Sequence, residues 1–479
     1  MDDPDDGSFD SLYGASYFRA IDSARTFYLY SFLRGYPAHH EKGVCMKISI
    51  VGTGHVGLVT GACFAEMGHQ VLCIDKDTEK LELLWKGKIP FYEPGLELLV
   101  RKHIKTKRLS LSDSIREGVL ASGVIFIAVG TPPRPNGEAD LSYVESVSRE
   151  IAKAMTRYRL VVEKSTVPVE TGEWVRRTIR QTLRRKIPFE VASNPEFLRE
   201  GQAVKDFLHP DRVVIGVESE KAEKILREIY RPLKVPLVVT DIKSAEIIKH
   251  ASNSFLSMKI SFINAIATLS EKVGADVVKI AEGVGLDRRI GKNFLNAGVG
   301  FGGSCFGKDL TAFIDIAAKA GVNFELLKEV QRINQRQREQ LVKKVEQAVW
   351  NLRGKTVGVL GLAFKPDTDD LRDAPSLDVI RALQKEGMLV KATDPAAMEN
   401  ARKILPDVEF CKNAYETARR ADCLILLTEW SQFKTLQWRR VKSLMSHPVI
   451  VDGRNLFDPD QMRKAGFRYY SVGRPAVLS

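Results

Sequence analysis

The chain has 479 residues, of which 44% are hydrophobic and 28% charged, a composition typical of folded globular proteins of about two to four domains. No run of about 18 apolar residues occurs, so the sequence predicts no membrane-spanning helix. The net charge of +12 indicates either a basic surface or an anionic ligand. Because no long basic run is interleaved with aromatic residues, nucleic acid is not an expected partner.

The cysteines are spread along the chain without any C-x-x-C pair, as Cys45, Cys63, Cys73, Cys305, Cys411 and Cys423. In a chain of this length, that distribution indicates a reducing compartment and no disulfide framework, so we expect a cytoplasmic protein. The clustered spacings of metal ligands do not occur in the sequence, and no metal is expected.

Residues 1–45 differ from the rest of the chain because they begin with several acidic residues and are rich in Phe and Tyr. They lack the basic first segment of a secretory signal. The stretch "MKISIVGTGHVG" that follows is typical of the beginning of a domain. We therefore expect Met46 to be the functional start and residues 1–45 to be a poorly ordered extension.

Between residues 46 and 240, short apolar runs alternate with helical patterns. The runs predicted to be strands are "KISIVG", "QVLCID", "GVIFIAVGT", "LVVEKST", "FEVASN", "RVVIGV" and "PLVVTD". Short runs rich in β-branched residues that alternate with helices indicate a parallel sheet covered by helices on both faces.

Residues 241–350 lack such runs and carry apolar residues at helical spacing. From Lys355 the alternation resumes with "KTVGVLGLAF", "LVKATDP", "CLILLTEW" and "PVIVDGRN". The predicted fold is α/β, with two Rossmann-like, doubly wound parallel-sheet domains joined by a central all-α domain that contains a long helix. The expected domain boundaries are 46–240, 241–350 and 351–479.

The turn "VGTGHVG" has G-x-G-x-x-G spacing after a predicted strand and before a predicted helix. In such a turn the first glycine allows a tight bend, the second lets a pyrophosphate approach, and the third lets the helix pack closely. We expect a dinucleotide to contact Gly52, Gly54, His55, Val56 and Gly57. Asp75 ends the next predicted strand, where it would bind ribose hydroxyls and repel a 2′-phosphate, so NAD is favoured over NADP.

The stretch "KHASN" places Lys249 and Asn253 one turn apart on the same face of a predicted helix. A lysine and an amide that point into a cleft can polarise an oxygen and stabilise an oxyanion during alcohol oxidation. From these residues alone, a surface lysine and a surface amide are the more ordinary interpretation.

The stretch "GFGGSCFGKD", residues 300–309, places Cys305 behind three glycines. Ser304 is a candidate helix cap, and Cys305 is expected in the first helical turn, where the helix dipole favours a thiolate. Asp309 follows one turn later on the same face, and a thiol beside an acid is a candidate nucleophile. A small buried cysteine at a glycine-rich turn fits these ten residues equally well.

NAD, an oxyanion-stabilising lysine and a nucleophilic thiol together indicate oxidation of an alcohol to a carboxylate. Such a reaction removes two hydrides, and a thiol can hold the aldehyde as a thiohemiacetal between them. The second hydride transfer would give a thioester, which water hydrolyses. A simple hydroxyacid dehydrogenase needs no such cysteine.

From Met46 to about residue 475 the chain resembles the UDP-glucose/GDP-mannose dehydrogenase family. The matching stretches occur in family order: "MKISIVGTGHVGLVTG", "VGTP", "VVEKSTVPV", "NPEFLREGQAVKDFLHPDRVVIG", "EIIKHASNSFL", "FLNAGVGFGGSCFGKD", "GLAFKPDTDDLRDAPS" and "DGRN". The resemblance implies NAD-dependent, four-electron oxidation of UDP-glucose to UDP-glucuronate through Cys305.

The resemblance also implies roles for particular residues in the reaction. Cys305 resembles the covalent nucleophile, and Lys249 and Asn253 resemble the pair that handles the substrate oxygen. Asp309 and Thr131 resemble residues that place the hydrolytic water. Glu163 resembles the base that activates that water. The residues that resemble neighbours of the cofactor are Lys80, Lys308, Thr131 and Glu163.

The substrate contacts implied by the resemblance are Phe197, Leu198, Glu200, Lys249, Asn253, Gly302, Lys365 and Arg454. Arg289 resembles an arginine that reaches the active site of a neighbouring subunit, which implies a homodimer or larger homo-oligomer built on the central helical domain. One departure is Gly307, where the family usually has proline. Glycine there costs up to about 1 kcal/mol of local helix stability, so a looser turn is expected.

Three alternatives remain open from the sequence. A related enzyme could oxidise GDP-mannose or a UDP-2-acetamido sugar, although the "NPEFLREG" loop favours UDP-glucose. A single-step NAD-dependent hydroxyacid dehydrogenase would share the dinucleotide domain and the lysine–asparagine pair, but would lack the thiol and the second sheet. A non-enzymatic anion-binding protein would explain only the net charge.

Overall fold

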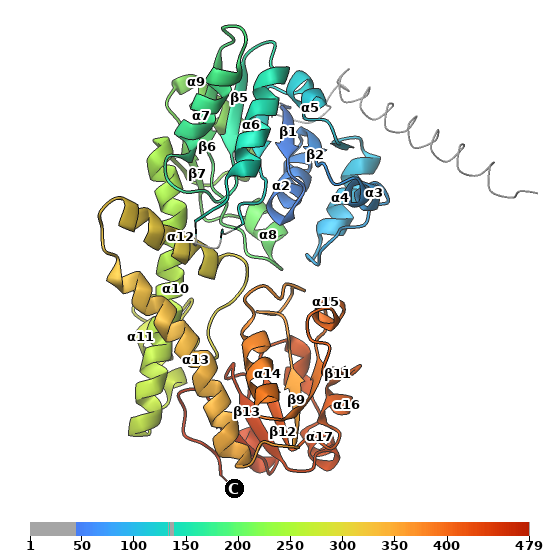
Figure 1. The fold of residues 1–479 in the computed structure, drawn as a ribbon, viewed down its shortest axis with the longest axis vertical. Coiled ribbons are helices and arrows are strands. Elements are labelled where there is room, and N and C mark those ends of the chain that lie inside the picture. Colours follow the sequence, from blue (N-terminus) through green and yellow to red (C-terminus); the bar gives the residue numbers. More distant parts are fainter. Residues whose placement is uncertain (1–44, 133, 135–137, 479) are drawn as a thin grey trace, which may run out of the picture. The chain divides into compact units, whose positions relative to one another are not determined.

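The computed structural model describes residues 45–132, 134 and 138–478, so the extension predicted for residues 1–45 lies, except for Cys45, outside the described residues. The chain divides into two compact units (Figure 1). Unit 1 comprises the described residues within 1–132 and 140–246, and unit 2 those within 133–139 and 247–479. The three predicted domain boundaries stay predictions.

Unit 1 contains an eight-stranded sheet. Its strands, from one edge to the other, are β3 (Leu109–Ser112), β2 (Gln70–Ile74), β1 (Lys47–Val51), β4 (Val124–Ile127), β5 (Arg159–Glu163), β6 (Phe189–Ser193), β7 (Val213–Gly216) and β8 (Leu237–Thr240). Its helices are α2 (His55–Glu66), α3 (Thr78–Trp85), α4 (Leu96–Lys105), α5 (Ile115–Ala121), α6 (Ser142–Ala154), α7 (Thr171–Thr182), α8 (Ala203–Leu208), α9 (Glu220–Tyr230) and the 3₁₀ turn η1 (Arg231–Leu233).

Helices cover both faces of this sheet, as the apolar strands predict. On β4, Phe126 packs into a core with α2, α4, α8 and α9. Its neighbours Ile125 and Ile127 point to the opposite face and pack with α5, α6 and α7. Because successive strand residues alternate between faces, a strand buried on both sides is apolar throughout.

Unit 2 begins with the central helices, α10 (Ile242–Val273), α11 (Val277–Gly285), α12 (Phe306–Lys319) and α13 (Glu325–Val349). Residues 242–246 of α10 belong to unit 1. No strand lies between residues 241 and 350, all of which are described, so the predicted helical character of this region is confirmed.

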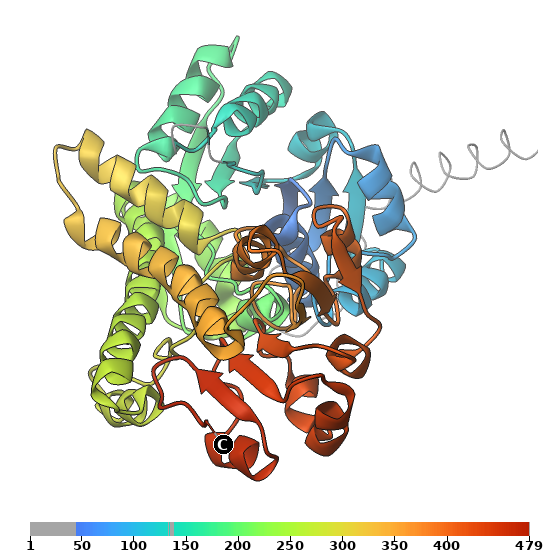
Figure 2. The same cartoon turned by 60° about the horizontal axis from the view of Figure 1, so that its bottom comes forward.

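The second sheet has six strands, all parallel (Figure 2). Their order is β11 (Val408–Phe410), β10 (Leu389–Thr393), β9 (Thr356–Leu360), β12 (Cys423–Leu426), β13 (Val449–Asp452) and β14 (Arg468–Ser471). The accompanying helices are α14 (Pro375–Lys385), α15 (Met398–Arg402), α16 (Ala414–Ala418), η2 (Ser431–Thr435), α17 (Trp438–Leu444) and α18 (Pro459–Lys464).

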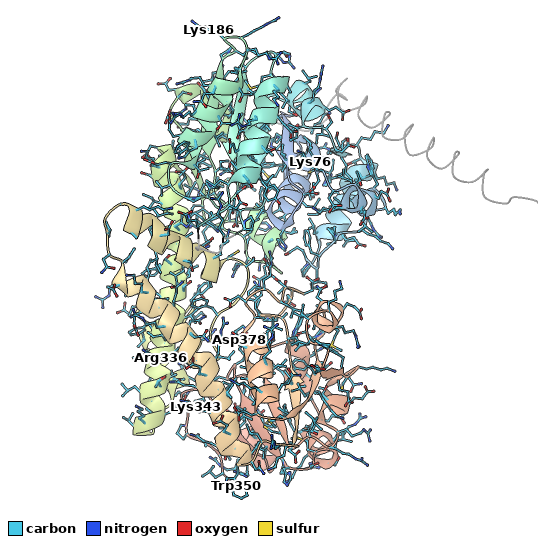
Figure 3. The ribbon with its side chains drawn as sticks, in the orientation of Figure 1. Lys76, Lys186, Arg336, Lys343, Trp350 and Asp378 are labelled. Carbon is cyan, nitrogen blue, oxygen red and sulfur yellow. The ribbon has the colours of Figure 1, made fainter. Side chains whose placement is uncertain are left out.

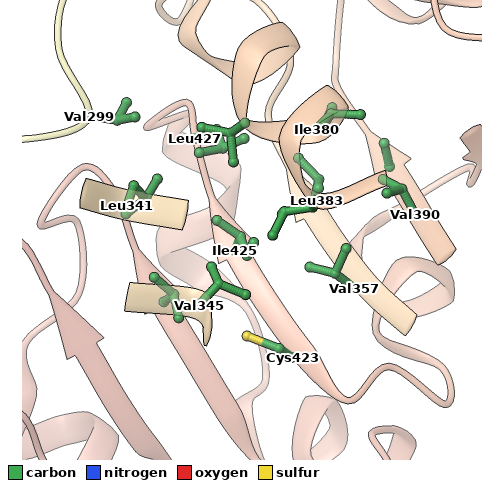
Figure 4. Packing of buried hydrophobic residues seen from close by; sticks show 14 of the residues in the cluster. Val299, Leu341, Val345, Val357, Ile380, Leu383, Val390, Cys423, Ile425 and Leu427 are labelled. Atoms are coloured by element: carbon green, nitrogen blue, oxygen red, sulfur yellow. The ribbon is translucent and has the colours of Figure 1, made fainter. Parts of the chain in front are cut away.

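The central helices and the second sheet share one hydrophobic core. Leu341 and Val345 of α13 pack with Val357 of β9 and Ile425 of β12 (Figure 4). Ile263 of α10 belongs to the same cluster. Burial of these side chains fixes α13 against the sheet, and each contributes roughly 1.5–3 kcal/mol.

Two features differ from the sequence prediction. The strands β3, β11 and β14 were not expected, and all three are short edge strands whose sequences are less uniformly apolar because each has one neighbour only. The pairing of β6 with β7 is antiparallel, through Ser193 and Gly216. The chain between them forms only the six-residue α8, which packs on α2 through Phe207 and Phe64, and not a crossover helix over the sheet.

Among the described residues, no helix combines the length and apolar character needed to cross a membrane. All six cysteines carry free thiols.

Candidate active site

The glycine turn of unit 1 joins β1 to α2. Gly52 has a φ of 101°, and a Cβ on Gly57 would lie 1.9 Å from the Gly52 carbonyl oxygen, so both positions require glycine. A Cβ on Gly54 would meet nothing within 4 Å. The backbone at the N-terminus of α2 is therefore open to an anionic group, and the turn fits the pyrophosphate of a dinucleotide.

Asp75 follows β2 and faces this turn. Its Oδ2 accepts hydrogen bonds from Thr53 N at 2.8 Å, Thr53 Oγ1 at 2.6 Å and Lys80 Nζ at 3.0 Å. Burial opposes ionisation of Asp75, but the bonds from Thr53, Asp77 and Lys80 outweigh it and lower the pKa of this carboxyl. Asp75 is thus an anion at the end of β2, and Lys80 lies beside it. That both contact the ribose of a cofactor stays a prediction.

The next residues of the turn introduce a link that sequence reasoning missed. The His55 ring stacks on Phe91, and its Nε2 lies 2.9 Å from Glu93 Oε2. The buried Glu93 carboxylate also accepts from Gly201 N at 2.7 Å and Ala203 N at 2.8 Å. Glu93 therefore ties the glycine turn to the loop of residues 196–202. Its only sequence signal is an acid in a proline- and glycine-containing loop. Val56 lies in the first turn of α2.

Glu163 ends β5, and its Oε1 accepts a hydrogen bond from Ser165 N at 2.9 Å. Burial, helped by the charge of Glu246, raises the pKa of the Glu163 carboxyl to about 8. Its Oε2 has no hydrogen-bond partner among the described residues. Thr131 is also buried, and its hydroxyl donates to Thr166 O at 2.9 Å. A buried acid with a pKa near neutrality can accept a proton at physiological pH.

The loop after β6 carries three predicted substrate contacts, Phe197, Leu198 and Glu200. The Arg212 guanidinium lies 3.9 Å from the Phe197 ring centroid, and Leu198 N donates to Glu196 Oε2 at 2.5 Å. Before the loop, Asn194 Oδ1 accepts from the buried Lys164 Nζ at 2.9 Å. Polar groups that sequence reasoning missed thus hold this loop.

In unit 2, α10 and α12 bring three predicted catalytic residues together. Lys249 and Asn253 are buried one turn apart on α10. Asn253 Nδ2 donates to Asp309 Oδ2 at 2.6 Å, and Lys308 Nζ lies 3.6 Å from Asp309 Oδ1. The amide therefore joins the helix that carries the lysine to the helix that follows Cys305.

Cys305 is the N-cap residue of α12, and Asp309 N donates to its carbonyl oxygen at 2.8 Å. The prediction that Ser304 caps the helix is wrong, because the helix begins one residue later and no side chain caps it. Ser304 Oγ instead lies 3.5 Å from Cys305 Sγ. Cys305 is partly exposed.

The other thiols differ from Cys305 in their surroundings. Cys63, Cys73, Cys411 and Cys423 are buried, and burial raises the pKa of each. Cys45 is exposed. Thiols whose ionised form is disfavoured by burial are poor nucleophiles, so Cys305 is the best placed of the chain's thiols for covalent chemistry next to charged groups.

The backbone before Cys305, residues 300–303, forms a close-packed loop that we call the cradle. Gly300 and Gly303 have φ values of 101° and 88°. A Cβ on Gly302 would lie 2.2 Å from Asp373 O, so no side chain fits there. Glycine at this position lets the chain around Asp373 pack directly against the cradle backbone.

Arg454 supports the cradle. Its guanidinium donates to Gly300 O at 3.0 Å, Phe364 O at 3.0 Å and Leu427 O at 2.8 Å. The guanidinium that we predicted to contact substrate therefore already donates to three backbone carbonyl groups, and the substrate contact stays a prediction. The two other cations predicted to meet substrate lie elsewhere in unit 2: Lys365 Nζ is 5.6 Å from the Phe364 ring centroid, and Arg289 pairs with Asp287 after α11.

The described residues include no group of three or more His, Cys, Asp or Glu side chains arranged to hold a metal ion. Two Rossmann-like sheets, an open glycine turn with an acid at the end of β2, and a partly exposed thiol at a glycine cradle define a dinucleotide-dependent α/β enzyme.

Comparison with known proteins identifies the family. Residues 46–234 match the NAD binding domain of the UDP-glucose/GDP-mannose dehydrogenase family, residues 243–336 its central domain and residues 358–459 its UDP binding domain. The chain belongs to this family.

Characterised relatives match nearly the whole chain after residue 45. The chain is 48% identical over 432 residues to UDP-glucose 6-dehydrogenase TuaD of Bacillus subtilis, covering 90% of this chain and 94% of that protein. It is 48% identical over 437 residues to UDP-glucose 6-dehydrogenase of Rhizobium meliloti, covering 90% and 100%. A solved UDP-glucose dehydrogenase from Pyrobaculum islandicum is 40% identical, with a TM-score of 0.86 over 92% of this chain and 100% of that one.

Proposed function

We propose that this chain oxidises UDP-glucose to UDP-glucuronate with NAD, in two hydride transfers joined by covalent intermediates on Cys305. The observation that carries the proposal is the partly exposed thiol at the N-terminus of α12, beside the hydrogen-bonded pair Asn253 and Asp309. The relatives named as UDP-glucose 6-dehydrogenases support the choice of substrate.

The first oxidation converts the C6 alcohol to an aldehyde, as C6 loses a hydride and the C6 hydroxyl releases its proton to water. Lys249 and Asn253 hold the C6 oxygen, and their donors stabilise negative charge on it as the C–H bond breaks. NAD, when bound, supplies the acceptor for each hydride. Gly52, Gly54 and Gly57 hold the pyrophosphate, with Asp75 and Lys80 at the ribose, as the open turn and the anionic carboxyl favour.

The Cys305 thiolate then adds to the aldehyde carbon, and a C–S bond forms while the carbonyl oxygen becomes an oxyanion of the thiohemiacetal. Lys249 and Asn253 stabilise that oxyanion. Loss of the second hydride from C6 restores the carbonyl as a thioester. No free aldehyde leaves the enzyme, because the carbon is bonded to sulfur between the two oxidations.

Hydrolysis of the thioester completes the reaction. We assign Asp309 and Thr131 to placing the water and Glu163 to accepting its proton. Only ionised Glu163 can accept it, and because the pKa of this carboxyl is about 8, hydrolysis should become faster as the pH rises towards 8. The C–O bond to water forms, the C–S bond breaks, and the thiolate of Cys305 leaves. Glu163 is thus the base of the last step only.

The ratio of NADH formed to UDP-glucose consumed tests the proposal. Two NADH per UDP-glucose is the expected result, and a ratio near one would contradict the double oxidation and favour a single-step dehydrogenase. Turnover of GDP-mannose or a UDP-2-acetamido sugar without turnover of UDP-glucose would instead overturn the choice of substrate.

We also propose that the chain forms a homodimer through α10. Phe255, Phe262 and Leu269 lie seven residues apart on one face of this helix and are 58%, 51% and 56% exposed. Arg289, whose side chain is 89% exposed, would reach the neighbouring subunit's active site. Light scattering of Phe262→Glu should report a monomer, and a dimer as stable as that of the unmodified chain would exclude this face.

The free thiols and the NAD chemistry favour a reducing compartment, and we propose the cytoplasm. Fractionation of cells that express the chain tests this, and recovery with a secreted fraction would contradict it.

A further inference from the structure

Helix α13 presents two buried polar side chains to the cradle, Asn334 and Arg338, one turn apart. Asn334 Oδ1 accepts from Phe301 N at 2.8 Å, and its Nδ2 donates to Phe301 O at 3.0 Å. Phe301 lies in neither a helix nor a strand, so its buried backbone groups need such partners. One amide side chain thus satisfies both polar groups of the residue at the centre of the cradle.

Arg338 adds a second link on the same side. Its Nη2 donates to Phe301 O at 3.0 Å and to Asp373 O at 3.3 Å. Its Nη1 donates to Asp373 Oδ1 at 2.9 Å and to Asp378 Oδ2 at 2.5 Å. Asp378, labelled in Figure 3, belongs to α14. A single guanidinium therefore joins α13, the cradle and the chain that enters α14.

The cradle is restrained on its other side by the loop before α14. Gly303 N donates to Arg372 O at 2.9 Å, and Gly302 lies so close to Asp373 that a Cβ would come within 2.2 Å of its carbonyl oxygen. On the α13 side, a Cβ on Gly300 would lie 2.6 Å from Asn334 Oδ1. The backbone is therefore held between α13 and residues 372–373.

Cys305 follows this held segment by two residues and begins α12. With the cradle fixed on one side and Asn253 bonded to Asp309 on the other, the thiol sits between two anchored points. Near-attack geometry is sensitive to displacement of about 1 Å, which can cost roughly 10²-fold in rate.

We propose that Asn334 and Arg338 are positioning residues for catalysis, because they fix the cradle and thereby the place of the Cys305 thiol relative to Lys249 and Asn253. This inference rests on the proposed role of Cys305 as nucleophile. Neither side chain is assigned any contact with substrate or cofactor, and both act through the backbone of Phe301.

The test compares Asn334→Ala, Asn334→Asp and Arg338→Lys with two exposed neighbours on the same helix, Gln335→Ala and Arg336→Lys. Asn334→Asp keeps the acceptor for Phe301 N but places a carboxylate oxygen against Phe301 O. Arg338→Lys keeps the positive charge, but a single ammonium group replaces the guanidinium that donates to four acceptors. Because Asp373 and Asp378 are about two-fifths exposed, this change strands no buried charge, so the variant should fold.

We expect kcat to fall by about 10- to 100-fold in the Asn334 and Arg338 variants, with KM for NAD unchanged within about twofold, because the glycine turn, Asp75 and Lys80 lie in unit 1. Hydrogen exchange at the Phe301 amide should accelerate in Asn334→Ala and stay slow in Asn334→Asp. Gln335→Ala and Arg336→Lys should match the unmodified chain in every measurement.

Unchanged kcat in folded Asn334 and Arg338 variants would overturn the inference, and so would loss of kcat accompanied by an equal rise in KM for NAD. Failure of the proposed function shows separately, as absence of UDP-glucose turnover in the unmodified chain. In that case exchange at Phe301, which needs no substrate, still decides whether the two side chains hold the cradle: unaccelerated exchange in Asn334→Ala overturns the inference.

Discussion

The six strands of the second sheet follow the same order as the first six strands of the eight-stranded sheet, but the turn after the first strand differs between the two sheets. In both, the first strand lies beside the second and the fourth, and the turn begins with a glycine of positive φ, Gly52 or Gly361. The amide of Gly52 donates to Ile74 O at 2.8 Å, and that of Gly361 to Thr393 O at 2.9 Å. The backbone geometry of the two turns is thus equivalent at this point.

The acid at the end of the second strand distinguishes them. Asp394, which corresponds to Asp75, is buried and accepts hydrogen bonds from Trp430 Nε1 and from four backbone amides, those of Leu362, Ala363, Ala396 and Ala397. Two of these amides belong to the turn itself, which lacks glycines at the places of Gly54 and Gly57. In the second sheet two consecutive amides of the turn thus donate to the protein's own carboxylate.

A shared fold therefore does not imply a shared ligand. The first turn donates its Thr53 amide to Asp75 but leaves the space beside Gly54 open, whereas the second turn also donates the amide of Ala363, at the place of Gly54, to its acid. The second loop instead supports the cradle, because Arg454 bridges Phe364 O and Gly300 O. The expected effects of substitution differ accordingly between the sheets.

The largest effect is expected for Cys305→Ala, which should abolish most of the turnover of UDP-glucose without changing the affinity for NAD. Cys305→Ala should reduce overall UDP-glucose oxidation on the order of 10³-fold or more, because no other partly exposed thiol adjoins Asn253 and Asp309. NAD affinity, measured by calorimetry, should stay unchanged, since the glycine turn lies in unit 1. Retention of both NADH equivalents by Cys305→Ala would contradict the covalent route.

The next effect concerns two glycines of the first turn. Gly57→Ala forces a Cβ to 1.9 Å from Gly52 O, so we expect about 1–3 kcal/mol of destabilisation and loss of NAD binding. Gly54→Ala meets no atom within 4 Å and should leave the unfolding free energy unchanged while raising KM for NAD. Denaturant unfolding measures the stability of the Gly57→Ala and Gly54→Ala variants, and titration with NAD measures their affinity for it. Equal losses of stability in the two variants would contradict the prediction that only Gly57→Ala destabilises the fold.

The two corresponding acids, Asp75 and Asp394, should differ in their effect on NAD binding when each is changed to asparagine. Asp394→Asn places an amide against backbone donors and should cost about 1.5–3 kcal/mol of stability without changing NAD affinity. Asp75→Asn should also lose stability, because an amide replaces the carboxylate that accepts from Thr53 and Lys80, but unlike Asp394→Asn it should raise KM for NAD by roughly tenfold, equivalent to about 1.4 kcal/mol. A shift of KM for NAD in Asp394→Asn would mean that the second turn also contributes to the cofactor site.

The pH dependence of unit 1 should depend on Glu163. Its pKa is about 8 in the folded chain against an ordinary 4.5, so between those values the folded chain holds a proton that the unfolded chain has released. Stability should therefore fall as pH rises through this window, by at most about 1.4 kcal/mol per pH unit, and level off above it. Glu163→Gln should reduce that slope, leaving the part below about pH 7 that Glu246 contributes because burial raises its pKa to about 7, and should remove the rise in thioester hydrolysis near pH 8. An unchanged thermal-stability profile would show that Glu163 is ionised throughout.

The smallest effect is expected at Gly307, where α12 meets the loop before α14. A Cβ there would lie 2.9 Å from Asp373 Oδ2, the end of a side chain that can move. Gly307→Pro, which restores the usual family residue, should change stability by less than about 1 kcal/mol and kcat by less than about twofold. A larger loss of kcat would show that Asp373 must stay in place for the cradle to function.

Local sequence patterns predicted most of the fold and indicated the candidate site. The glycine turn, the apolar strands and the long helices were predictable because glycine spacing and apolar periodicity act over a few residues. The edge strands β3, β11 and β14 were not, because their assignment depends on a neighbouring strand and not on their own sequence. The cap of α12 was misplaced by one residue because several neighbouring residues can cap a helix.

The sequence by itself determined the two-sheet α/β architecture and the dinucleotide turn, and it indicated Cys305 as the candidate nucleophile, because each depends on a short motif with its own geometry. Only the tertiary structure decided which polar groups support them. Asn334 and Arg338 are distant in sequence from Phe301, and Glu93 is distant from Gly201, so no local pattern links them. Likewise, Asp75 and Asp394 follow equivalent strands and each accepts from the amide after the first glycine of its turn, and only the tertiary structure shows that Asp394 also accepts from Ala363 N and Trp430 Nε1.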